Sequence, residues 1–177
     1  QSLMYHLGSG KAWDLSKRRD GLYILPPFGN GNAEYTNRIE TLSAIEGFLR
    51  NSKEEYVLLS DSDVVCNIDY QKVIDSHIRN NADITVLYKR GQIPSKMAEP
   101  MVLSLEPDGR IKDIIIDPRI DSEYSYAFDQ ALIKRELLIH LISECSSRNR
   151  SNFKKDIYQA NVSKLRMYGY EFSGFSQ

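Results

Sequence analysis

The spacing of apolar and polar residues predicts strands alternating with helices in the first half of the chain. Short apolar runs at 56–60 and 83–88 are typical of strands buried on both faces of a sheet. Residues 37–50 and 70–80 carry apolar side chains every three or four positions, which predicts helices with one buried stripe. A further strand is predicted at 21–25. This alternation favours a parallel sheet built from right-handed crossovers.

The second half of the chain predicts a different arrangement. Residues 101–105 and 110–116 are strand-like and flank Glu106-Pro107-Asp108-Gly109. Because Pro presets φ and Gly accepts a positive φ, this turn predicts an antiparallel hairpin. The remaining predicted elements are a strand at 127–133, helices at 135–145 and 153–162, and a strand at 164–172.

Together these elements predict an α/β fold with one domain over residues 1–177. We expect a three-layer α/β/α, Rossmann-like domain, with a mostly parallel sheet and an added antiparallel hairpin. A chain of 177 residues with 41% hydrophobic residues is large enough for one such core.

Charge and cysteine content narrow the functional classes. A net charge of −1 gives no general attraction to nucleic acid or anionic membranes. No apolar run approaches the ~20 residues of a membrane-spanning helix. The two cysteines lack zinc-site spacing, and free thiols are typical of a reducing compartment. We therefore expect a cytoplasmic protein that binds neither nucleic acid nor membrane.

An acidic segment, Ser60-Asp61-Ser62-Asp63, directly follows the predicted strand at 56–60. Ligands of open α/β sheets bind just beyond the carboxyl ends of the strands. Carboxylates at that place suit Mg²⁺, which takes one or two of them and leaves other positions for phosphate and water. The alternative is a turn in which Asp and Ser cap the next helix.

A glycine-rich turn near the start of the chain is a second candidate for ligand binding. Gly8-Ser9-Gly10-Lys11 can cradle a phosphate, although it lacks the spacing of a P-loop. Trp13 and Asp14 follow it. The alternatives are an exposed loop lysine and a tryptophan that packs rather than stacks on a base.

Five segments stand out together because they keep one order along the chain. The segments are His6-Leu7-Gly8-Ser9-Gly10-Lys11-Ala12-Trp13-Asp14-Leu15, Leu25-Pro26-Pro27, residues 55–70 with the helix after them, Phe153-Lys154-Lys155-Asp156 and Tyr168-Gly169-Tyr170-Glu171-Phe172-Ser173-Gly174-Phe175. In this order they resemble the nucleotidyltransferase domain of glucose-1-phosphate adenylyltransferase, also called ADP-glucose pyrophosphorylase. That family makes ADP-glucose and pyrophosphate from ATP and glucose 1-phosphate.

The resemblance implies a set of site residues. Asp63 and Asp156 match the two aspartates that hold Mg²⁺ between the phosphates, and either could instead cap a turn or a helix. The resemblance also implies a nucleotide and sugar-phosphate cleft lined by Lys11, Trp13, Asp14, Tyr35, Asp117 and Asp129.

The chain departs from the catalytic members of this family at four places. They carry His after the metal-binding Asp, where this chain has Val64, and Gly-Thr where Thr36-Asn37 follows Tyr35. Their Glu-Lys-Pro is replaced by Ile116-Asp117-Pro118, and their Ser-Met-Gly by Ala127-Phe128-Asp129. An aspartate repels a phosphate dianion where a lysine attracts it.

These departures, and the segment from Ser62 to Tyr70, are similar to the GlgD-type subunit of the family. The resemblance implies a regulatory, weakly or non-catalytic subunit that pairs with a catalytic paralogue. ATP, glucose 1-phosphate or a sugar-phosphate effector would be its ligands. The alternative is a catalytically competent Mg²⁺-dependent sugar-phosphate nucleotidyltransferase.

The resemblance also implies that the chain is a piece of a longer protein. The first strand of the family domain and its glycine-rich fingerprint are expected before Gln1. Residues 164–177 are expected to lead toward a C-terminal β-helix domain.

Overall fold

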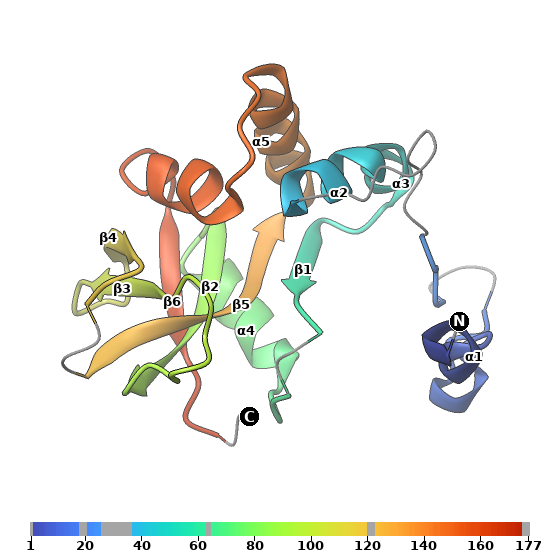
Figure 1. The fold of residues 1–177 in the computed structure, drawn as a ribbon, viewed down its shortest axis with the longest axis horizontal. Coiled ribbons are helices and arrows are strands. Elements are labelled where there is room, and N and C mark those ends of the chain that lie inside the picture. Colours follow the sequence, from blue (N-terminus) through green and yellow to red (C-terminus); the bar gives the residue numbers. More distant parts are fainter. Residues whose placement is uncertain (1, 18–20, 26–36, 63–64, 120–122, 175–177) are drawn as a thin grey trace. The chain divides into compact units, whose positions relative to one another are not determined.

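The structure is a computed structural model that describes residues 2–17, 21–25, 37–62, 65–119 and 123–174. The chain divides into two compact units, Gln1–Glu34 and Tyr35–Gln177. Figure 1 shows the elements of both units along the chain. No helix among the described residues is long and apolar enough to cross a membrane.

The first unit holds one short helix, α1 (Ser2–Leu7), and a 3₁₀ turn, η1 (Lys11–Trp13). Gly10 adopts φ +72°, a conformation that suits glycine, and a Cβ there would lie 2.9 Å from Leu15 Cβ. The strand predicted at 21–25 is not formed within the described residues. Its sequence has the composition of a strand, but Leu22 makes only one backbone hydrogen bond to Leu15, and a strand requires a neighbour to pair with.

The second unit is built on one mixed sheet. Its strands are β1 (Tyr56–Ser60), β2 (Ile84–Gly91), β3 (Met101–Leu105), β4 (Ile111–Ile116), β5 (Tyr124–Lys134) and β6 (Met167–Glu171). The sheet order is β4-β3-β5-β2-β6, and β1 pairs with β5. The helical elements are α2 (Arg38–Ala44), α3 (Glu46–Asn51), α4 (Tyr70–Arg79), α5 (Arg135–Ser147), a π-helical turn η2 (Lys154–Tyr158) and a 3₁₀ turn η3 (Gln159–Asn161).

The prediction of a mostly parallel sheet is not confirmed, because most strand pairings are antiparallel. Among the described strands only β2 and β6 pair in parallel. Strand β5 lies between β1 and β2 and runs opposite to both. Hydrophobic spacing indicates that a strand is buried but not which strand lies beside it, so the insertion of β5 could not be predicted.

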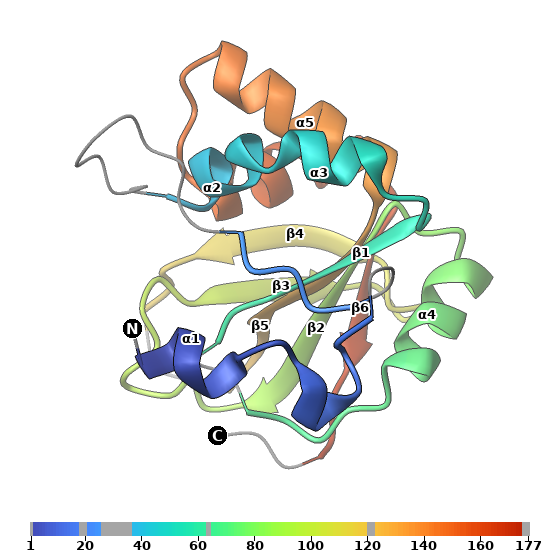
Figure 2. The same cartoon turned by 90° about the vertical axis from the view of Figure 1, so that its right-hand side faces the viewer.

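Helices cover both faces of this sheet, which confirms the predicted α/β fold. Along β2, Ile84, Val86 and Tyr88 pack into a core formed with α2, α3 and α5. Leu87 points to the other face, where it belongs to a second core with Val73 of α4. Figure 2 shows α2, α3 and α5 together on one side of the sheet and α4 apart from them. Alternate residues of each strand therefore supply two separate cores.

Two predicted helix starts are confirmed by their caps. The Asn37 side chain accepts a hydrogen bond from the Glu40 N–H at 3.0 Å at the start of α2. The Asp69 side chain accepts one from the Gln71 N–H at 3.1 Å at the start of α4. The helix predicted at 37–50 is divided into α2 and α3 at Ile45, whose ψ of 11° departs from helical geometry.

The predicted hairpin is confirmed and joins β3 to β4. Gly109 adopts φ +85° in its turn, and the Glu106 carbonyl accepts the Gly109 N–H at 2.9 Å. The turn also reaches β6, because the Gly169 N–H donates to the Gly109 carbonyl at 2.9 Å. A Cβ at Gly169 would lie 2.8 Å from the Tyr88 ring, so this close approach requires glycine.

Candidate functional site

The first part of the candidate site lies where β1 ends and α2 begins. The Asn37 cap fixes the first turn of α2 and so places Arg38. The Arg38 guanidinium forms an ion pair with Asp61 at 2.7 Å. It also donates to the backbone carbonyl of Asp129 at 3.4 Å and lies 5.1 Å from the centre of the Phe153 ring. Arg38 therefore connects the acidic segment after β1 to β5 and to the residue before η2.

The second part is an ion pair between β5 and η2. The Lys154 ammonium lies 3.1 Å and 3.3 Å from the two carboxylate oxygens of Asp129. It also donates to the Glu99 carbonyl at 2.9 Å. Only 14% of the Lys154 side chain and 26% of the Asp129 side chain are exposed, so water screens this pair weakly. We call Arg38, Asp61, Glu99, Asp129 and Lys154 the cation network.

Glu99 connects the loop after β2 to the start of η2. Its carboxylate accepts a hydrogen bond from the Asn152 side chain at 2.9 Å and lies 3.9 Å from the Lys155 ammonium. Its backbone has φ +48°, a conformation that costs energy for a residue with a Cβ. The contacts to Asn152, Lys154 and Lys155 offset that cost and hold the loop against η2.

Asp156 caps the turn in which it lies. Its carboxylate accepts the Asn152 N–H at 3.0 Å, and the Asn152 side chain accepts the Lys155 N–H at 2.9 Å. This reciprocal arrangement satisfies two backbone donors at the start of a helical segment. The capping alternative for Asp156 is therefore observed, whereas its role as a metal ligand stays a prediction.

A buried tyrosine lies beside the cation network. The Tyr158 ring packs edge-on against Phe153, with 5.3 Å between the ring centres. Burial raises the pKa of the Tyr158 phenol, Asp129 and Asp61 raise that pKa further, and Arg38 opposes them. The phenol is therefore neutral at physiological pH, and its ring packs against Phe153, the ring that lies next to the Arg38 guanidinium.

The remaining predicted cleft residues fall in different places. Trp13 packs edge-on against His6 at 5.7 Å and is 48% exposed, and Asp14 pairs with Lys17 at 3.3 Å. Lys11 is exposed in the same unit. Asp117 directly follows β4 and has φ +55°, and its N–H donates to the Pro100 carbonyl at 2.8 Å.

Two of the predicted residues cannot be placed. Tyr35 and Asp63 lie outside the described residues. Of the predicted cleft residues, Asp117 and Asp129 therefore lie in the described second unit, and Asp129 is joined to the segment of Asp156 through Lys154. Sequence reasoning missed Arg38 and Lys154 as site residues. The Asn37 cap and the Phe153-Lys154-Lys155-Asp156 segment are the signals that would have pointed to them.

Of the two predicted magnesium ligands, only Asp156 belongs to the residues that the structure describes. Within them, no group of three His, Cys, Asp or Glu side chains is close enough to hold a metal ion. Asp156 is half-buried and uses one carboxylate oxygen for its cap. Mg²⁺ takes one or two protein carboxylates and completes its octahedron with phosphate and water. Asp156 therefore fits as one ligand of such an ion.

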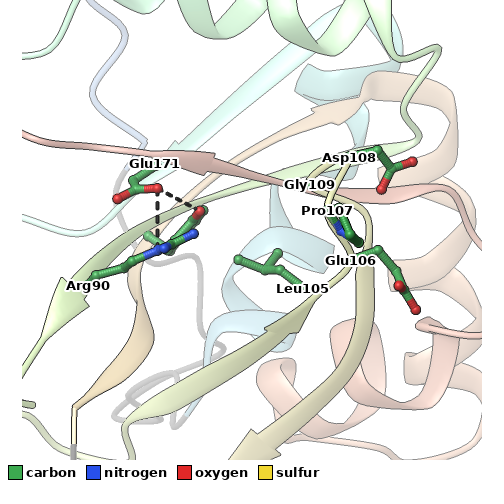
Figure 3. Close-up of a pocket in the computed structure, with 8 residues that line it drawn as sticks. Arg90, Leu105, Glu106, Pro107, Asp108, Gly109 and Glu171 are labelled. Carbon is green, nitrogen blue, oxygen red and sulfur yellow. Dashed lines mark hydrogen bonds and ion pairs between the residues drawn. The ribbon is translucent and has the colours of Figure 1, made fainter.

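A hollow of about 480 Å³ lies elsewhere, between β2, β6 and the β3–β4 hairpin. Figure 3 shows Arg90 and Glu171 on one side of it and the hairpin residues 105–109 on the other. The Tyr88 hydroxyl donates to Glu171 at 3.1 Å, and Arg90 lies 3.4 Å from the same carboxylate. None of the predicted cleft residues that the structure describes lines this hollow.

Comparison with known proteins identifies two groups of relatives, although no family model matches the chain. It is 39% identical to glycogen biosynthesis protein GlgD of Geobacillus stearothermophilus over 95 residues, which are 52% of this chain and 27% of that protein. It is 34% identical to GlgD of Bacillus subtilis over 93 residues, which are 52% of this chain and 27% of that protein. It is 28% identical to glucose-1-phosphate adenylyltransferase of Clostridium acetobutylicum over 191 residues, 98% of this chain and 47% of that protein.

The α/β fold with its mixed sheet agrees with a nucleotidyltransferase domain. The chain is a relative of the glucose-1-phosphate adenylyltransferases, and the predicted resemblance to the GlgD type within them is confirmed. It spans less than half the length of these curated relatives.

Proposed function

We propose that this chain is part of a regulatory, weakly or non-catalytic subunit of ADP-glucose pyrophosphorylase in glycogen biosynthesis. Its partner would be a catalytic paralogue in a hetero-oligomer. That partner would convert ATP and glucose 1-phosphate to ADP-glucose and pyrophosphate. The higher identity to GlgD proteins than to the adenylyltransferases supports this choice.

The observation that carries the proposal is the pairing of the site's two central cations with the chain's own carboxylates. Nucleotidyl transfer depends on charge that is free to bind and neutralise phosphates. Here Arg38 is paired with Asp61, and Lys154 is paired with Asp129. The exposed Asp117, at a position where the family uses lysine, adds a further negative charge.

The test is to express the complete protein that contains this chain, alone and together with a catalytic glucose-1-phosphate adenylyltransferase. ADP-glucose formation and its response to sugar-phosphate effectors are measured for both preparations. We expect turnover of the protein alone far below the ~1–10³ s⁻¹ of typical enzymes. We also expect co-purification with the partner and a changed effector response of the complex.

Turnover in the usual enzymatic range by the protein alone would contradict the proposal. It would favour a Mg²⁺-dependent sugar-phosphate nucleotidyltransferase, which the retained Asp156 supports as the second candidate. Asp63 and Asp156 would then hold the ion together with substrate phosphates. In that case activity would be lost with a chelator and in Asp63→Asn, but kept in Asp75→Asn, which changes an exposed carboxylate of α4.

A further inference from the structure

The Lys154 ammonium is fully engaged within the protein. An ammonium has three N–H donors. Lys154 has three acceptors within hydrogen-bond distance, namely the Glu99 carbonyl at 2.9 Å and the two Asp129 carboxylate oxygens at 3.1 Å and 3.3 Å. With 14% of its side chain exposed, little of this cation is open to water or to a ligand.

Arg38 approaches the same residue of β5 from α2. Lys154 contacts the Asp129 carboxylate, and Arg38 donates to the Asp129 carbonyl. The Phe153 ring under the guanidinium limits the directions in which Arg38 can turn. One short segment of β5 is therefore bordered by two cations that come from separate helical elements.

Lysine and arginine side chains held in place are typical of sites that bind a phosphate group. Lys154 contacts the Asp129 carboxylate, whereas Arg38 contacts the Asp129 carbonyl and pairs with Asp61. Asp129 supplies the anion from within the chain. A free ligand loses translational and rotational freedom when it binds, whereas Asp129 is already in place. The Asp129 carboxylate therefore pairs with Lys154 at a smaller loss of entropy than a dissolved phosphate compound that makes contacts of similar strength.

We propose that Asp129 is an internal competitor for phosphate, whose carboxylate holds Lys154 in the place of a phosphate-bearing ligand. The inference deepens the proposed function and rests on it, because it assigns the loss of phosphate binding to one side chain. The ligand class is a small phosphate compound, either a phosphomonoester such as glucose 1-phosphate or inorganic pyrophosphate. Loss of the Asp129 charge frees Lys154 for that ligand.

The test is isothermal titration calorimetry, without divalent cations, on the same preparation of the protein that is used for the turnover measurement. Inorganic pyrophosphate and glucose 1-phosphate are titrated separately into the parent protein, Asp129→Asn and the double variant Asp129→Asn/Lys154→Met. We expect Asp129→Asn to bind at least one of the two compounds about tenfold more tightly than the parent, a change of about 1.4 kcal/mol. The double variant is expected to lose that gain. The compound that gains affinity identifies the ligand source.

The matched control is Asp75→Asn, which removes one negative charge at an exposed position of α4. We expect no gain there. Equal affinity of the parent and Asp129→Asn, an equal gain in Asp75→Asn, or a gain that survives Lys154→Met would each overturn the proposal. If Asp129→Asn does not fold, Asp129→Ser serves the same comparison, because it also removes the charge while leaving a small polar side chain.

This experiment separates the inference from the proposed function. Calorimetry requires no turnover, so a gain in Asp129→Asn supports the inference whether or not the parent protein is an enzyme. Turnover by the parent protein would overturn the regulatory role alone. Absence of the gain in a parent protein that is also inactive would overturn the inference and leave the regulatory role standing.

Discussion

His77 is a histidine enclosed between α4 and β2, with 1% of its surface exposed. Its Nδ1 lies 2.7 Å from the Thr85 hydroxyl, and its Nε2 has no hydrogen-bond partner among the described residues. Burial lowers the pKa of His77 to about 4; Lys134 lowers it too, while Asp83 and Glu55 oppose the shift. The imidazole is therefore neutral in the folded protein near pH 7.

The lowered pKa of His77 predicts that the free energy of unfolding falls as the pH is lowered from 6.5 to 4. In the unfolded chain the histidine pKa is about 6.5, so unfolding takes up a proton below that pH. The stabilising effect of a neutral His77 is complete above pH 6.5, falls between pH 6.5 and pH 4, and is absent below. The loss from this group, once the pH is below both pKa values, is on the order of 3 kcal/mol.

The measurement is urea unfolding of the parent protein and of His77→Gln at pH 7.5, 6, 5 and 4. We expect the free energy of unfolding of His77→Gln to fall less than that of the parent over this range. His140→Gln, at an exposed position of α5, is the control and should follow the parent. A parent and His77→Gln with parallel pH profiles would show that His77 does not titrate in this way.

Side-chain chemistry within the candidate site could be predicted only in part. Asp129 and Asp156 were predicted as candidates through the resemblance, because each lies in a segment that can be compared with the family. Arg38 and Lys154 were not found, since each is paired with a carboxylate far away in sequence. Only the fold brings Asp61 to Arg38 and Asp129 to Lys154.

At the scale of elements, the contact between the hairpin and β6 depends on Gly169. A Cβ at this position would lie 2.8 Å from the Tyr88 ring and 2.9 Å from the Leu105 side chain. We expect Gly169→Ala to force these neighbours apart and to lower the free energy of unfolding by about 1–3 kcal/mol. The corresponding fall in Tm is measured by far-UV circular dichroism.

Gly47→Ala is the matched control for this substitution. Gly47 lies inside α3, and a Cβ there would meet nothing within 4 Å. Alanine favours a helix over glycine, so this change is expected to stabilise by about 0.5–1 kcal/mol. The two substitutions add the same methyl group, but their expected effects on the free energy of unfolding have opposite signs. An unchanged Tm for Gly169→Ala would contradict the role assigned to this close approach.

Local elements were the most predictable part of the fold. The hairpin followed from Pro107-Asp108-Gly109, and the starts of α2 and α4 followed from Asn37 and Asp69, because turns and caps depend on neighbouring residues. The strand predicted at 21–25 failed, since a strand also needs a partner that its own sequence does not specify. The place of β5 between β1 and β2 was missed for the same reason.

At the scale of the whole molecule, the two units differ in what holds them together. Both hydrophobic cores lie within residues 39–172. Within residues 5–17 and 21–25 of the first unit, Gly10 is the only residue that is buried. These residues bury little apolar surface and so contribute a small driving force for cooperative folding.

Trp13, the only tryptophan of the chain, lies in the first unit and reports on it separately. In urea, we expect tryptophan fluorescence to change at lower concentration than far-UV circular dichroism, which is dominated by the second unit. A fragment of residues 35–177 should then keep the circular dichroism transition, with a free energy of unfolding within about 1 kcal/mol of the full chain. Coincident transitions, together with a fragment that no longer unfolds cooperatively, would mean that residues 1–34 are part of the same folding unit. If the fragment folds, it contains all of the cation network, so its response to pyrophosphate in the Asp129→Asn background reports on that site without the first unit.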